Sequence, residues 1–332
     1  MTAVQTGELT TVDVAQGGFE GRFADWTADA RYFEYTRAAN PVGSGLTPRV
    51  PLEQFPAALH ASGPTRVVPL DLSGPLGIPD GAATSPGLLA SFVRIEACGQ
   101  VSTAPDATSE LYYVLSGAGF SSVNGELVRW GEGDVLTLPA GSRSVHYADA
   151  DSVLYWVHDE PLLRYLGVSA TVPRFRPTRY PAQRSLAELD AIANDPHATD
   201  RNRLSVLLAN VDNPQTLTVT HVLWAMVGLL PAGQVQPAHR HQSVALDLII
   251  DCQPGCYTLV GDRIDDGGRI VSPARVDWEQ GGAFVTPPGK WHAHHNESGA
   301  DAHLIPVQDA GLQTYLRSHD IRFATTHTSA RE

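Results

Sequence analysis

Cysteine is scarce in this 332-residue chain, which contains three: Cys98, Cys252 and Cys256. Three scattered cysteines exclude a disulfide framework, and Cys252 and Cys256 are interpreted as small buried hydrophobes rather than metal ligands. Long apolar runs are also missing. No segment is apolar over the length of a membrane span, and the first residues lack the basic region and apolar stretch of a secretory signal. We therefore expect a cytoplasmic protein that does not enter a membrane.

Positive charge is limited as well. The chain has 23 Lys and Arg against 36 Asp and Glu, for a net charge of −13, and its basic residues form no cluster. Nucleic acids and anionic membranes both attract concentrated positive charge, so neither is an expected partner. The expected partner is a small molecule. The length supports two domains or one duplicated architecture.

Short β-rich runs dominate the sequence. They are separated by Gly, Pro and Asp, as in "ELYYVLSG", "DVLTLPAG", "LDLIID" and "AFVTPPG". Regular short strands with turn signals predict a mainly β sandwich or barrel rather than alternating βα units. Two segments, "RSLAELDAIANDP" and "DAGLQTYLRSH", have a helical pattern.

The two halves of the chain resemble each other. A Gly, a Pro and a second Gly recur at the same offsets in "GDVLTLPAG" and "GGAFVTPPG", which indicates a duplicated domain. The proline-rich stretch "VPRFRPTRYPAQ" between them predicts a linker. The expected organisation is an N-terminal arm and packing segment over 1–85, a first copy over 86–172, a linker and helix over 173–205, and a second copy over 206–332.

Histidines gather in the second copy. Because side chains of a strand alternate between its faces, His239 and His241 in "PAHRHQ" point the same way and Arg240 points the other way. The later run "TPPGKWHAHHNES" adds His292 and His294, which also share one face. Two such pairs can converge on one metal ion.

These residues resemble the two cupin motifs. The first motif is matched by Gly233, His239 and His241, and the second by Gly281, Pro287, Gly289, His292 and Asn296. The resemblance implies two cupin barrels (double-stranded β-helix, jelly-roll) in one chain, with an extended N-terminal arm.

The first motif departs from its general form at two positions. Ala245 stands where the motif has a ligand Glu, and Cys252 replaces the closing Gly. The loss of Glu predicts a three-histidine site made of His239, His241 and His292, a ligand set that leaves coordination positions open and suits non-heme Fe(II) with molecular oxygen as co-substrate. The alternative is a set of histidines satisfied in a polar barrel mouth without a metal.

A closer resemblance follows from "PAHRHQSVAL" and "TPPGKWHAHHN", which are similar to runs of the gentisate, salicylate and 1-hydroxy-2-naphthoate dioxygenase group. These bicupins bind ferrous iron by three histidines and cleave an aromatic ring. The resemblance implies that His294 contacts substrate and moves protons as the catalytic histidine. The expected substrate contacts are Asp247, Trp291 and Gln242, although Trp291 fits an ordinary core aromatic equally well.

Asp247 stands where that group usually has an arginine that grips the substrate carboxylate. An inverted charge would repel a simple benzoate, so the substrate carries an amine or hydroxyl there, or another arginine compensates, or Asp247 is satisfied at the barrel rim.

The group's metal normally lies in the N-terminal cupin, whereas here the ligand set lies in the second copy. Aligning the copies puts Ala104, Asp106 and Ser144 where His239, His241 and His292 stand, so we expect no metal in the first copy. Glu110 keeps the acidic position there, and Arg143 and His146 are assigned to structure or to a subunit interface.

Three functions compete at this stage. The first is a mononuclear non-heme Fe(II) dioxygenase that cleaves or oxidises a hydroxylated or aminated aromatic ring. The second is another metal-dependent cupin enzyme, such as a lyase, isomerase or oxidase, on a small polar substrate, because one fold hosts many chemistries. The third is a binding or storage bicupin without turnover. The resemblance also implies a homodimer or homotetramer.

Overall fold

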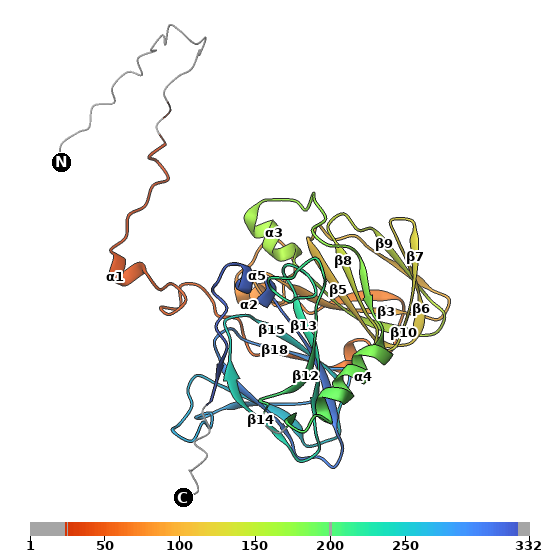
Figure 1. Ribbon diagram of the computed structural model, residues 1–332. Coiled ribbons are helices and arrows are strands. Elements are labelled where there is room, and N and C mark those ends of the chain that lie inside the picture. Colours follow the sequence, from red (N-terminus) through yellow and green to blue (C-terminus); the bar gives the residue numbers. More distant parts are fainter. Residues whose placement is uncertain (1–23, 25, 199–200, 325–332) are drawn as a thin grey trace, which may run out of the picture. The chain divides into compact units, whose positions relative to one another are not determined.

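The computed structural model describes residues 24, 26–198 and 201–324 (Figure 1). The chain divides into two compact units, residues 1–47 and 48–332. The described part of the first unit contains one short helix, α1 (Tyr35–Ala38). The second unit contains the sheets and the remaining helices.

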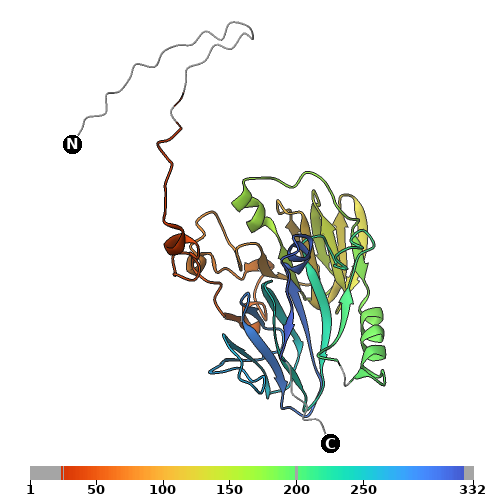
Figure 2. The same cartoon turned by 60° about the vertical axis from the view of Figure 1, so that its left-hand side comes forward.

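The second unit is built from two copies of a two-sheet barrel, seen from two sides in Figures 1 and 2. The first copy pairs a six-stranded sheet of order β11-β8-β5-β10-β3-β2 with a four-stranded sheet of order β4-β9-β6-β7. Its strands are β2 (Arg66–Pro69), β3 (Leu89–Ile95), β4 (Gln100–Thr103), β5 (Ser109–Ser116), β6 (Ala118–Val123), β7 (Glu126–Gly131), β8 (Val135–Pro139), β9 (Ser144–Ala148), β10 (Ser152–His158) and β11 (Thr178–Tyr180).

The second copy repeats this plan with a six-stranded sheet of order β1-β18-β15-β20-β13-β12 and a five-stranded sheet of order β17-β16-β19-β14-β21. Its strands are β1 (Gln54–Phe55), β12 (Leu204–Leu208), β13 (Trp224–Leu230), β14 (Val235–Arg240), β15 (Ala245–Asp251), β16 (Cys256–Gly261), β17 (Ala274–Asp277), β18 (Ala283–Thr286), β19 (Trp291–Asn296), β20 (Ala302–Gln308) and β21 (Arg322–Phe323). The predicted mainly β duplicated fold is confirmed.

Short helices connect the sheets. The two predicted helices are present as α4 (Ala182–Ala193) and α5 (Ala310–Tyr315). The others are η1 (Ala57–Leu59), α2 (Ser73–Leu76) and α3 (Glu160–Leu166). In the described part of the chain, no helix is long and apolar enough to cross a membrane.

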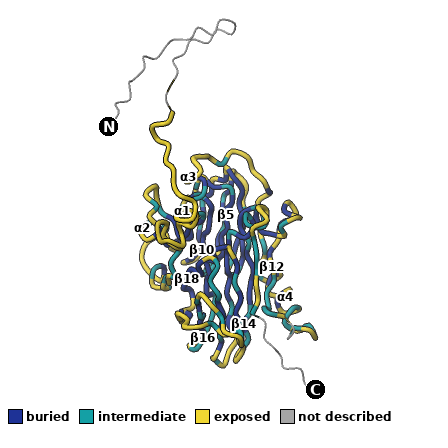
Figure 3. Tube along the Cα trace, turned by 90° about the vertical axis from the view of Figure 1, so that its left-hand side faces the viewer, coloured by how far each residue is buried: buried dark blue, intermediate teal, exposed yellow. Residues whose placement is uncertain are grey.

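Alternation of side chains along the central strands produces three apolar cores. On β5, Leu111 and Tyr113 pack between the two six-stranded sheets, whereas Tyr112 and Val114 pack inside the first barrel. On β15, Leu246 enters the core between the sheets, and a third core fills part of the second barrel. Strands buried on both faces account for the near-continuous hydrophobic runs in the sequence, and Figure 3 shows that burial concentrated in the central strands.

The segment before the first barrel contributes to both copies. β1 pairs with β18 at the edge of the second copy's six-stranded sheet, while β2 pairs with β3 in the first copy. This segment therefore extends a sheet in each copy.

Candidate metal centre

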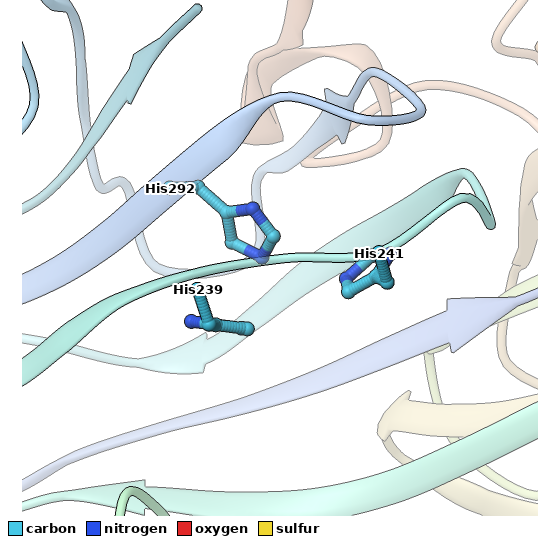
Figure 4. Close-up of side chains that lie close together, drawn as sticks. All are labelled: His239, His241 and His292. Atoms are coloured by element: carbon cyan, nitrogen blue, oxygen red, sulfur yellow. The ribbon is translucent and has the colours of Figure 1, made fainter. Parts of the chain in front are cut away.

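Two neighbouring strands bring three imidazoles together inside the second barrel. His239 near the end of β14 lies directly across from His292 on β19, and His241 follows the end of β14. The ring centroids of His239 and His292 are 4.0 Å apart, and those of His241 and His292 are 4.9 Å apart. One nitrogen from each ring lies within 4.8 Å of the others, and all three residues are buried (Figure 4). A group of this kind can hold a metal ion.

A hydrogen bond links the two sequence motifs at this point. The amide of Gly289, whose φ is +74°, donates to the carbonyl oxygen of His241 at 2.7 Å. Glycine adopts this left-handed conformation at low cost, which explains its place in the Pro-x-Gly turn. The turn thus fixes the position of His241 after its strand has ended.

Backbone carbonyls orient the rings. Nδ1 of His241 lies 2.9 Å from the carbonyl oxygen of Ser243, and Nδ1 of His292 lies 3.1 Å from that of Lys290. Nδ1 of His239 is 3.4 Å from the carbonyl oxygen of Pro237. Because a carbonyl oxygen can only accept, these contacts place the proton on Nδ1 of His241 and His292 and leave the lone pair on Nε2. This is the arrangement that metal-binding histidines use. Nδ1 of His239 lies at a similar distance, 3.5 Å, from Nε2 of Gln236, which can only donate.

Burial keeps the three rings neutral. Desolvation lowers the pKa of His241 to about 4 and lowers the pKa values of His239 and His292 well below the ordinary value. A neutral imidazole with a free Nε2 is the form that ligates a metal. The donor set therefore fits a divalent transition metal.

His294 lies beside this group on the same face of β19, with its ring centroid 5.7 Å from that of His292. It is 1% exposed. Its Nδ1 lies 2.8 Å from Oγ1 of Thr258, a residue that the sequence patterns did not single out.

A cavity of about 280 Å³ opens next to the histidines. His239 and His241 form part of its wall, and β12, β13 and β21 supply half of the other lining residues. The residues that line it are Asn202, Arg203, Ser205, Leu207, Trp224, Met226, Gln236, His239, His241, Gln308, Ile321 and Phe323. Its volume is close to the lower end of the range for small-molecule sites.

Arg203 is a site residue that sequence reasoning missed, because it falls in the expected linker. It lies in the cavity wall just before β12, and its Nη2 is buried without a hydrogen-bond partner among the described residues. Burial lowers the pKa of Arg203 to about 10, which still leaves it charged at neutral pH. The available signal was a single arginine at the head of the apolar run "RLSVLLAN".

Asp247 faces into the same barrel from β15 and is 2% exposed. Its Oδ2 accepts a hydrogen bond of 2.7 Å from Thr286. Burial raises the pKa of Asp247 to about 6, an effect opposed by that bond and by the charge of Arg203. It does not line the cavity.

The other two expected substrate contacts lie elsewhere. Trp291 has the opposite orientation on β19 to His292, and the guanidinium carbon of Arg240 lies 5.2 Å from its ring centroid. Gln242 is exposed and accepts a hydrogen bond from the amide of Asp320. The structure thus brings neither residue to the wall of the cavity.

Strand register corrects the alignment of the two copies by one residue. Thr103 on β4 lies across from Ser144 on β9, as His239 lies across from His292. In β14 a bulge between Gln236 and His239 adds one residue that β4 lacks. Thr103, rather than Ala104, therefore occupies the position of His239 in the first barrel.

The other residues singled out in the first copy are divided between its interior and its surface. His146 and Glu110 are buried inside the barrel, at 0% and 2% exposure, and Arg143 is exposed. His146 is thus enclosed in the interior rather than lying at the rim.

Comparisons with known proteins find similarity to several aromatic 1,2-dioxygenases. No protein-family model matches the chain. It is 42% identical over 62 residues to a 5-aminosalicylate 1,2-dioxygenase from Comamonas sp. and 29% identical over 159 residues to a 1-hydroxy-2-naphthoate 1,2-dioxygenase from Nocardioides sp. (strain KP7). These matches cover 18% and 47% of this chain, and they span 17% and 38% of the respective relatives.

Solved structures match over more of the chain. Salicylate 1,2-dioxygenase from Pseudoaminobacter salicylatoxidans, as an adduct with gentisate, superposes with a TM-score of 0.65 at 16% identity, over 88% of this chain and 90% of that one. At 16% identity this structural similarity establishes the fold alone. The sequence matches and the shared fold together confirm the relationship that the motifs indicate: this chain is a bicupin related to the gentisate, salicylate and 1-hydroxy-2-naphthoate dioxygenase group.

Proposed function

We propose that this protein is a mononuclear non-heme Fe(II) dioxygenase that cleaves the ring of a hydroxylated or aminated aromatic acid. The observation that carries the proposal is a group of three neutral histidines, two of which line a cavity. The wall of that cavity also holds Arg203, whose buried Nη2 has no hydrogen-bond partner among the described residues. The relatives that match the sequence are named for substrates that are aromatic acids.

His239, His241 and His292 would hold the iron through Nε2, because Nδ1 of each ring is turned to a backbone carbonyl. When bound, ferrous iron would supply a redox-active centre with open positions where substrate oxygens and dioxygen can meet. Ala245, in place of a carboxylate ligand, leaves the charge of the ion for the substrate to balance.

Arg203 would orient the substrate. A buried guanidinium without a partner is costly, and a carboxylate satisfies it with two parallel hydrogen bonds. Arg203 therefore supplies the cation that is missing at position 247. Asp247 lowers the net positive charge of the barrel interior, which favours substrates with a hydroxyl or amino substituent over a simple benzoate.

Metal analysis and oxygen uptake test this function. Protein purified without oxygen should contain about one iron per chain and consume oxygen with at least one of gentisate, salicylate, 5-aminosalicylate and 1-hydroxy-2-naphthoate. His239→Ala should lose both the iron and the oxygen uptake. The matched control is His295→Ala, because His295 stacks on Tyr257 at 4.7 Å on the other face of the strand that carries His292. Zinc alone, or no metal after ferrous reconstitution, would contradict the proposal.

The position of Asp247 favours a second candidate, a metal-dependent cupin enzyme that acts on a small polar substrate without cleaving a ring. A buried carboxylate beside the site suits a substrate with donor groups. Turnover without oxygen uptake, supported by a redox-inert metal, would favour this candidate. We also propose that the assembly is a homodimer or homotetramer, which light scattering of the purified protein would test.

A further inference from the structure

Both barrels contain the same chain of three side chains. In the second barrel the indole N–H of Trp278 donates to Oγ1 of Thr258 at 2.8 Å, and this oxygen lies 2.8 Å from Nδ1 of His294. In the first barrel the indole of Trp130 donates to Oγ of Ser121 at 2.9 Å, and this oxygen lies 2.7 Å from Nδ1 of His146. Register makes the two chains equivalent, because each hydroxyl residue lies across from its histidine.

The chain in the first barrel continues to a carboxylate. Nε2 of His146 lies 3.0 Å from Oγ1 of Thr103, which lies 2.7 Å from the hydroxyl of Tyr112. That hydroxyl donates to Oε2 of Glu110 at 2.6 Å. An indole N–H can only donate, so every hydroxyl in the chain is satisfied when Ser121 donates to His146 and each later group donates to the next. The proton of His146 then resides on Nε2.

The same logic applies in the second barrel. Thr258 is 0% exposed, so its hydroxyl hydrogen cannot turn to water. Its oxygen already accepts from Trp278, and the remaining partner of the hydroxyl is Nδ1 of His294. If Nδ1 carried the proton, the buried hydroxyl hydrogen would have no acceptor, which is the more costly arrangement. Thr258 therefore donates to Nδ1, and the proton of His294 resides on Nε2.

The two barrels differ in which group accepts a hydrogen bond from that Nε2–H. In the first barrel the acceptor is Thr103, which occupies the register position of His239. In the second barrel, within the described residues, the hydrogen bonds of His294 use Nδ1 alone. The ring lies 6.0 Å from that of His239, between centroids, so its Nε2–H is available at the candidate metal centre.

We propose that Trp278 and Thr258 are positioning residues that hold His294 as a fixed hydrogen-bond donor. On the basis of the proposed function, the group it serves is a negatively charged oxygen of the bound aromatic acid, either a phenolate or a carboxylate oxygen. His294 then stabilises charge on substrate and does not abstract a proton, because its only lone pair is occupied by Thr258. Two of the candidate ligands, His241 and His292, carry the opposite tautomer, with the proton on Nδ1.

Ring nitrogen NMR of the full chain tests the tautomer without any turnover. With ¹⁵N-labelled histidine and metal removed by a chelator, His294 should show one tautomer with the proton on Nε2, assigned with His294→Gln. Thr258→Ser should keep this pattern, because serine supplies the same hydroxyl at the equivalent position of the first barrel. Thr258→Val removes the hydroxyl that holds Nδ1, so the fraction of the Nε2–H form should fall and the two tautomers should be mixed. Trp278→Phe should give a mixture, because the hydroxyl can then either donate or accept.

The matched control is Ser121→Ala, which breaks the same chain in the barrel without the histidine triad. It should change the signal of His146 and leave that of His294 unchanged. A wild-type His294 protonated on Nδ1 would overturn the proposal. So would an unchanged Nε2–H form in both Thr258→Val and Trp278→Phe.

Kinetics adds a second readout if the substrate panel identifies a turnover. Thr258→Val should lower kcat/KM by roughly tenfold to a hundredfold at unchanged metal content, and Thr258→Ser should restore most of it. Equal kcat/KM in both variants would contradict a positioning role. Failure of the dioxygenase proposal is seen separately as absent iron or absent oxygen uptake, while the ring nitrogen signals still report the tautomer.

Discussion

Replacement of Asp247 by asparagine should stabilise the protein by an amount that grows as the pH rises from about 4 to about 7. Asp247 is 2% exposed, and burial raises its pKa from 3.8 to about 6. The folded state therefore binds this proton more tightly than the unfolded state does. The resulting stabilisation is complete below about pH 4 and is lost as the pH rises through about 6, and a shift of about two units corresponds to ~3 kcal/mol.

Asparagine carries no titrating proton, and its side-chain oxygen can still accept the hydrogen bond from Thr286. Relative to wild type, Asp247→Asn should therefore gain up to ~3 kcal/mol between about pH 4 and pH 7. The assay is the free energy of unfolding in urea across this range, on chelator-treated protein, plotted as the difference between variant and wild type. Other buried acids titrate in both proteins and cancel from that difference.

Glu110→Gln is the matched control, because burial raises the pKa of Glu110 from 4.5 to about 7 in the other barrel. Its difference curve should rise later and level off above about pH 7. A difference curve for Asp247→Asn that is flat with pH would refute the argument that this carboxyl is desolvated. A curve that coincides with that of Glu110→Gln would refute the assignment of the window to Asp247.

Other substitutions test the site and the frame around it. His292→Ala should abolish metal binding, so that added ferrous or zinc ion no longer raises the melting temperature; a retained metal-dependent shift would exclude His292 as a ligand. Arg203→Met should weaken the binding of salicylate to the zinc-loaded protein by at least about tenfold in calorimetry, whereas Arg201→Met, on the exposed side, should not. Gly119→Ala should cost ~1–3 kcal/mol in urea unfolding, because its Cβ would lie 2.0 Å from the carbonyl oxygen of Tyr147; an unchanged midpoint would contradict the close strand contact.

Local spacing made the histidine group predictable from the sequence. His239, His241 and His292 lie in two short motifs whose strands pair directly, so that alternation and a Pro-x-Gly turn were enough to bring the three rings together. Helices α4 and α5 were predictable for the same reason, since their patterns are local. Helix α3 was missed although Gly167, at φ +65°, ends it.

Residues that reach the site from distant strands were not predictable in this way. Arg203 immediately precedes β12 in the other sheet of the barrel, and its proposed role depends on a buried Nη2 that has no hydrogen-bond partner among the described residues. Trp291, in contrast, was expected as a substrate contact and does not line the cavity. It adjoins His292 in the sequence, but on a strand that adjacency places it on the other face, against Arg240.

The two barrels show how small a change separates a closed polar core from an open site. Both keep an indole, a hydroxyl and a histidine at equivalent register positions. In the first barrel Thr103 accepts from that histidine and passes the chain to a buried carboxylate, so every polar group is satisfied within the protein. In the second barrel β14 has a one-residue bulge, and His239 occupies the position of Thr103. The ring of His294 therefore lies beside the histidine triad instead of beside a threonine hydroxyl. A donor without an acceptor among the described residues has a free-energy cost, and a bound anionic oxygen would offset that cost. The proposed substrate contact of the second barrel therefore corresponds to the position that Thr103 fills in the first.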